Sequence, residues 1–99
     1  MMILRDLILA NYNIQITDII LLDQYFGTEI YLVSENDKRY IVKNLPLTVP
    51  NLEKEEPLTR YLAQNGIQVA RVLLTNDGEG CVKTEQTQFH VQDLLMEKP

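Results

Sequence analysis

The chain has 99 residues, with a hydrophobic fraction of 45%, a charged fraction of 23% and a formal net charge of −5. This composition excludes a disordered chain, and the length predicts one domain, residues 1–99, with a single modest core. The acidic balance and the lack of clustered lysine and arginine argue against a surface for nucleic acid or for an anionic membrane.

A single cysteine and a single histidine limit the chemistry that the chain can carry. Cys81 alone can form no intrachain disulfide and no cysteine-based metal site, so it is expected to act as a small hydrophobic residue in a reducing, cytoplasmic location. His90 alternates with Phe89 and Val91, which predicts a position on the surface or in a groove. The apolar run near the start, "LILA", is too short for a signal peptide or a membrane span.

The first half of the chain predicts a short helix followed by an antiparallel meander. Apolar residues recur at mostly helical spacing over residues 2–11, which indicates an amphipathic helix. Three segments rich in branched and aromatic residues are then expected to form strands, at residues 18–24, 29–34 and 39–44. Gly27 separates the first two strands, and Asn36 and Asp37 form the tip between the second and third.

The second half predicts a helix and further strands. The helix is expected to begin at Glu55 or Glu56, because Pro57 is tolerated only in a first turn, and to end at the Asn-Gly pair 65–66. Strands are then expected at residues 68–76 and, as one short and one longer strand, within residues 81–95. The predicted fold is therefore α+β, a five- to six-stranded antiparallel sheet packed with one main helix plus a short N-terminal helix.

Lys43 ends an apolar strand, and this position has two interpretations. The lysine could be a solvated strand end, or it could hold a phosphate in a cleft. Side chains alternate along a strand, so Ile41 and Lys43 share one face, while Tyr40 and Val42 share the other.

The candidate partner of Lys43 is an acidic residue of the following helix. Leu52, Glu55, Leu58 and Leu62 fall roughly on one stripe, and Tyr61 shares a face with Leu58 and Leu62. If the helix extends back through residue 52, Glu55 points inward, where a carboxylate needs a cation such as Lys43. The alternative for Glu55 is a solvated place in the acidic run "EKEE". Glu56 precedes Arg60 by four residues, which predicts a surface ion pair.

The ordered set of motifs resembles the amino-terminal lobe of the aminoglycoside phosphotransferase and choline kinase group, which has a protein-kinase-like fold. The resemblance rests on "GTEIYLV", "YIVK", the helix glutamate followed by "YL" and "NGI", and "FHVQDLLME". It extends from about Ile14 to Glu97, and no single motif carries it.

This resemblance implies a site for ATP with magnesium. Lys43 would contact the α- and β-phosphates, oriented by Glu55 or, as the fallback, by Glu56. The turn containing Gly27 would lie over the phosphates. The adenine would lie against the remaining site residues, with Ile30 and Ile41 over its face and the backbone near Gln92, Leu94 and Leu95 at its edge.

Two departures from the family pattern lead to a second hypothesis. The phosphate turn holds only Gly27, where Tyr25 and Phe26 could crowd a phosphate, and the chain stops at Pro99, before the lobe that carries the catalytic residues of such kinases. The chain alone is thus expected to be inactive, with the second lobe and a nucleotide as partners and the phosphate acceptor undefined. The alternative is a stand-alone protein-interaction module with the same fold. Apolar surface at "VQDLLM" predicts self-association in either case.

Overall fold

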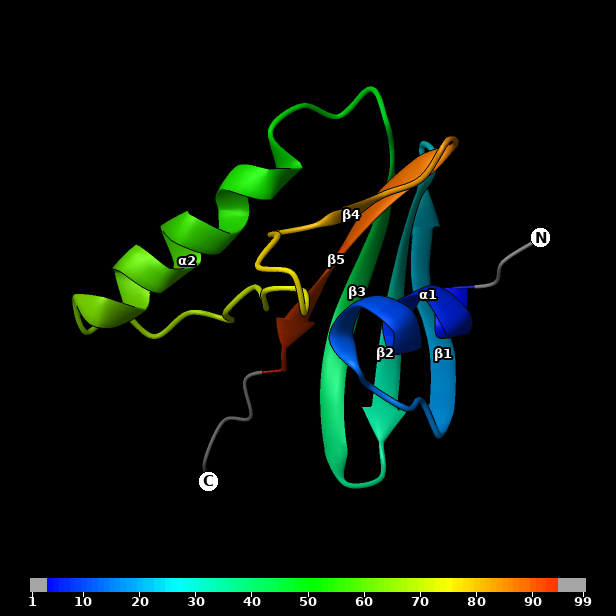
Figure 1. Ribbon diagram of the computed structural model, residues 1–99, viewed down its shortest axis with the longest axis horizontal. Helices are drawn as coiled ribbons and strands as arrows, with labels where there is room; N and C mark the ends of the chain where they lie inside the picture. The colour runs from blue at the N-terminus through cyan, green and yellow to red at the C-terminus, as the bar shows by residue number, and fades with distance from the viewer. Residues whose placement is uncertain (1–3, 95–99) are drawn as a thin grey trace.

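The computed structural model describes residues 4–94 and contains two α-helices, one 3₁₀ helix and five strands (Figure 1). In chain order these are α1 (Leu4–Tyr12), β1 (Asp18–Tyr25), β2 (Thr28–Glu35), β3 (Lys38–Pro46), η1 (Leu52–Lys54), α2 (Glu55–Gln64), β4 (Val82–Lys83) and β5 (Thr87–Asp93). The strands form one antiparallel sheet in the order β1-β2-β3-β5-β4. The predicted α+β class is confirmed, with the lower of the two expected strand numbers.

One face of the sheet packs against α1 and forms the core. Strand alternation turns Val33, Val42 and Val91 to this face, where each is fully buried. Ile8 and Tyr12 of α1 cover them, and the Tyr12 ring lies 6.3 Å from the ring of Phe89. The amphipathic pattern predicted for the first helix is thus what holds α1 on the central strands, in front of the sheet in Figure 1.

The prediction of a strand at residues 68–76 is wrong. Only an isolated antiparallel bridge forms there, between Val72 and Gln92, with two flanking main-chain hydrogen bonds that join residues 71 and 73 to β5. The physical reason is that this edge of β5 is shared: β4 pairs with its first half, so only a short stretch remains for the incoming segment.

The helix predicted to begin at Glu55 or Glu56 begins at Glu55, directly after η1, and Pro57 lies in its first turn. The expected apolar stripe is buried only in part: Leu52 is buried, whereas Leu58 and Tyr61 are exposed by more than half. The buried residues of α2 are instead Glu56 and Thr59. None of the helices within residues 4–94 has the length and apolarity needed to cross a bilayer.

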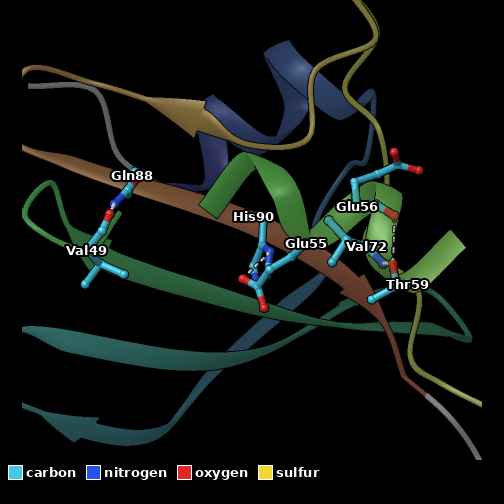
Figure 2. Close-up of polar contacts among 7 residues, drawn as sticks. All are labelled: Val49, Glu55, Glu56, Thr59, Val72, Gln88 and His90. Carbon is cyan, nitrogen blue, oxygen red and sulfur yellow. Dashed lines mark hydrogen bonds and ion pairs between the residues drawn. The ribbon is translucent and has the colours of Figure 1, made fainter. Parts of the chain in front are cut away.

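Polar side-chain contacts hold the β3–α2 connection and α2 itself. In the connection, Gln88 of β5 donates hydrogen bonds to the carbonyl oxygens of Pro46, at 2.9 Å, and Val49, at 2.6 Å. Within α2, the Thr59 hydroxyl accepts a hydrogen bond from the amide of Val72, in the segment that follows the helix, at 3.1 Å (Figure 2). These contacts fix the position of α2, and with it the position of Glu55.

Candidate functional site

The face of the sheet opposite α1 gathers most of the predicted site residues, and we call it the open face. The strand registers place Ile30, Lys43 and His90 in one row across β2, β3 and β5. Leu32, Ile41 and Gln92 form the adjacent row. Directly paired residues of antiparallel strands project to the same side, so an ammonium group lies among apolar side chains on this face. Ile30, Ile41 and Lys43 are all half-buried.

Glu55 reaches the same face from α2. Its carboxylate Oε2 lies 3.6 Å from Nδ1 of His90, the direct cross-strand partner of Lys43 (Figure 2). The Glu55 side chain remains 45% exposed. Within residues 4–94, no direct ion pair joins Glu55 to Lys43. The structure therefore brings Glu55 beside His90, the cross-strand partner of Lys43.

His90 is fully buried, which contradicts its predicted surface or groove position. The error arises because β5 lies inside the sheet, with α1 covering its Phe89 face and the start of α2 approaching its His90 face. Neither ring nitrogen has a hydrogen-bond partner among the residues that the structure describes. Burial, and secondarily the positive charge of Lys43, lower the pKa of His90 to about 4, so the imidazole is neutral at pH 7.

Glu56, the fallback partner of Lys43, is buried and pairs with Arg60 instead. Its carboxylate forms the predicted ion pair with Arg60, at 3.5 Å, but its side chain is only 4% exposed, so the pair is not the surface pair that the sequence predicted. Glu56 and Arg60 line a cavity of about 230 Å³ together with Arg71 and Asp93. Of the two candidate glutamates, Glu55 is therefore the one that lies beside His90, the cross-strand partner of Lys43.

Gly27 lies in a two-residue hairpin turn. Phe26 and Gly27 both have positive φ angles, 47° and 81°, and Tyr25 pairs with Thr28 across the turn. Two positive φ angles in succession are typical of a type I′ turn, which favours glycine. The Phe26 side chain is 98% exposed at this tip.

The residues predicted at the adenine edge lie near the end of β5. Gln92 projects to the open face beside Ile41, and Leu94 is half-buried just after the strand. Leu94 also lines a hollow of about 300 Å³ with residues of the β2–β3 turn. Leu95 lies outside the described residues, as does Met96 of the "VQDLLM" segment, whereas Val91 of that segment is fully buried in the core instead of adding to an apolar surface.

Sequence reasoning missed the polar residues that place α2 and Glu55: Thr59, Gln88 and His90. Alternation of Gln88, His90 and Gln92 with apolar residues was a visible signal, but it is the pattern of any strand with one solvated face. No cluster of acidic, histidine or cysteine side chains suited to a metal ion occurs within residues 4–94.

Comparisons with known proteins identify a structural likeness and no sequence match. No protein-family model matches the chain, and a search of curated proteins finds no match. Among solved structures, the chain is similar to a spectinomycin phosphotransferase, APH(9)-Ia, whose crystal structure holds ADP and spectinomycin. The TM-score is 0.76 at 16% sequence identity, over 93% of this chain and 28% of that enzyme.

This likeness shows a kinase-like fold, and the resemblance to an aminoglycoside phosphotransferase is confirmed at the level of the fold. The chain corresponds to little more than a quarter of the length of that enzyme.

Proposed function

We propose that this chain is the nucleotide-binding lobe of a small-molecule phosphotransferase, which binds ATP with magnesium for phosphoryl transfer to a hydroxyl acceptor. The observation that carries the proposal is the convergence of Ile30, Ile41 and Lys43 on the open face, with Glu55 beside them. The ADP in the structurally similar phosphotransferase supports the same ligand class.

The residue types of the open face fit a nucleotide. An ammonium group donates to phosphate oxygens, and Lys43 is the only cation in the Ile30–Lys43–His90 row. The branched side chains of Ile30, across from it, and Ile41, two residues before it, offer an apolar surface to a flat base. In this proposal Ile30 and Ile41 contact the adenine, the backbone of residues 92–95 bonds its edge, and Lys43 binds the α- and β-phosphates.

The remaining part of the reaction lies outside this lobe. ATP supplies the phosphoryl group, and magnesium neutralises charge on its phosphates. Because residues 4–94 hold no cluster suited to a metal ion, the proposal assigns the protein ligands of magnesium, and the acceptor site, to a second lobe. The turn at Gly27 would approach the phosphates only through its main-chain groups. The isolated chain then binds nucleotide weakly and transfers nothing, and a cytoplasmic location belongs to the same proposal.

Calorimetric titration of the 99-residue chain with ADP tests this function. Lys43→Ala is expected to lower the affinity about tenfold, since it removes a charge-assisted contact to phosphate. Lys38→Ala is the matched control, because Lys38 begins the same strand and pairs with Glu35 at its far end. Equal affinities of the two variants would remove Lys43 from the site.

A second candidate is a stand-alone protein-interaction module, favoured by the exposed apolar residues of the β1–β2 tip and of α2. Phe26 is 98% exposed, and Leu58 and Tyr61 are 55% and 62% exposed. These residues would then contact a protein partner or a second copy of the chain. Sedimentation at high concentration separates the candidates: concentration-dependent association that Leu58→Ser abolishes supports the module, while a monomer that binds ADP opposes it.

A further inference from the structure

Burying the imidazole of His90 carries a cost. A neutral imidazole has one N–H donor and one acceptor nitrogen, and both ring nitrogens of His90 lack partners among the described residues. Most buried polar groups in folded proteins are paired, and an unpaired one is a known sign of a functional role. Leucine would fill a comparable space without this cost, so the presence of histidine at a fully buried site calls for an explanation.

Two charged residues neighbour the imidazole. Glu55 approaches Nδ1 from α2, at 3.6 Å, about 0.6 Å longer than an ordinary hydrogen bond. Lys43 is the cross-strand partner of His90 on β3, close enough for its charge to lower the pKa of the imidazole. Because the Glu55 side chain is 45% exposed, its carboxylate has room to move the remaining distance.

We propose that His90 is a positioning residue that links Glu55 to Lys43: its Nδ1–H donates a hydrogen bond to the Glu55 carboxylate, and its Nε2 accepts one from the Lys43 ammonium. The effect on nucleotide binding rests on the proposed function. The bridge itself does not, because it is a property of the folded chain. In this arrangement the imidazole replaces the direct ion pair between Lys43 and Glu55, which is not formed within residues 4–94.

The neutral state of His90 fits this role. A protonated imidazole would carry two donors and could not accept a hydrogen bond from an ammonium group. The pKa of His90 is lowered to about 4 by burial and by Lys43, so the bridge has its acceptor available at pH 7.

The other charges near this row do not replace Glu55 or Lys43. On β4, Lys83 is paired with Glu53 of η1, at 3.8 Å. On β5 itself, the neighbours of His90 on the open face are the uncharged Gln88 and Gln92. The α1 side of β5 carries Phe89 and Val91.

The experiment uses NMR, because His90 is the only histidine and its ring signals need no assignment. Long-range ¹H–¹⁵N correlation at pH 7 is expected to show the proton on Nδ1. Lys43→Met is expected to raise the pKa of His90, because it removes a positive charge, and Glu55→Gln is expected to lower it, because it removes a negative one. A proton on Nε2, or a pKa that responds to neither variant, overturns the bridge.

The functional part is tested with His90→Leu and ADP. Leucine keeps the space filled and removes both hydrogen bonds of the bridge, so ADP affinity should fall about tenfold, while thermal melts check that the variant stays folded. His90→Asn, whose amide can still donate toward Glu55, should recover part of that loss. Unchanged affinity in His90→Leu refutes a positioning role. If the wild-type chain binds no ADP, the proposed function fails, and the tautomer and pKa shifts decide the bridge by themselves.

Discussion

Replacing Thr59 with valine tests the contact that docks α2, the helix that carries Glu55. The Thr59 hydroxyl accepts a hydrogen bond from the Val72 amide at 3.1 Å and donates one to the Glu56 carbonyl at 3.1 Å. Thr59 is 8% exposed and Val72 is 1% exposed. Valine has nearly the same shape as threonine, so the change removes the hydroxyl and little else.

The cost follows from which group loses its partner. The Glu56 carbonyl lies inside α2 and keeps its main-chain acceptor role, whereas the buried Val72 N–H is left without an acceptor, which costs about 1–3 kcal/mol. For a domain of this size each kcal/mol lowers the melting temperature by about 4–8 °C. Thr59→Ser is the matched control: it retains the hydroxyl and loses one methyl group, about 1 kcal/mol.

Thermal melts followed by circular dichroism give the stability, and amide hydrogen exchange gives the location. Thr59→Val should melt lower than the wild type, and the Val72 amide should exchange faster, while Thr59→Ser keeps that amide protected. A Thr59→Val melt that coincides with the wild-type curve, with the Val72 amide still protected, would refute the docking role of this hydroxyl.

Three further outcomes are expected. The unfolded chain holds a proton on His90 below pH 6.5, and the folded chain only below about pH 4. The unfolding free energy should therefore fall by about 3 kcal/mol between pH 7 and pH 4. Denaturant titration of His90→Leu should show a decrease that is smaller by this amount. Gly27→Ala should lower the unfolding free energy by about 1–2 kcal/mol, because φ is +81° and the new Cβ would lie 3.1 Å from Pro46 Cγ; Gly66→Ala, with the same φ in open space, should lose less. Gln88→Leu should cost about 2 kcal/mol in the same titration, since it removes both hydrogen bonds to the β3–α2 connection.

Local chemistry made most of the fold predictable. The Asn-Asp and Phe-Gly turns, the branched strand segments and Pro57 are signals that act over a few neighbouring residues, and β1, β2, β3 and the start of α2 follow them closely. The segment at residues 68–76 has the same strand-like composition, yet it forms only one bridge, because β4 already occupies part of the edge of β5. Whether a strand edge is free for pairing depends on the tertiary structure, and no local sequence pattern indicates it.

The candidate site was also predictable only in part. Alternation along β3 correctly separated Ile41 and Lys43 from Tyr40 and Val42, since that requires only the period of a strand. The burial of His90 and the exposure of Leu58 were not predictable, because they depend on which element covers which face. The orientation of α2 is set by a threonine hydroxyl and a main-chain amide, not by an apolar stripe.

The central claim is that a nucleotide binds the open face beside Lys43, and isoleucine methyl NMR tests it most directly. On addition of millimolar ADP, the methyl signals of Ile30 and Ile41 should shift, while those of Ile8 and Ile14, buried on the α1 side, should not. Shifts confined to Ile8 and Ile14, or no shift at any of the four, would contradict the account.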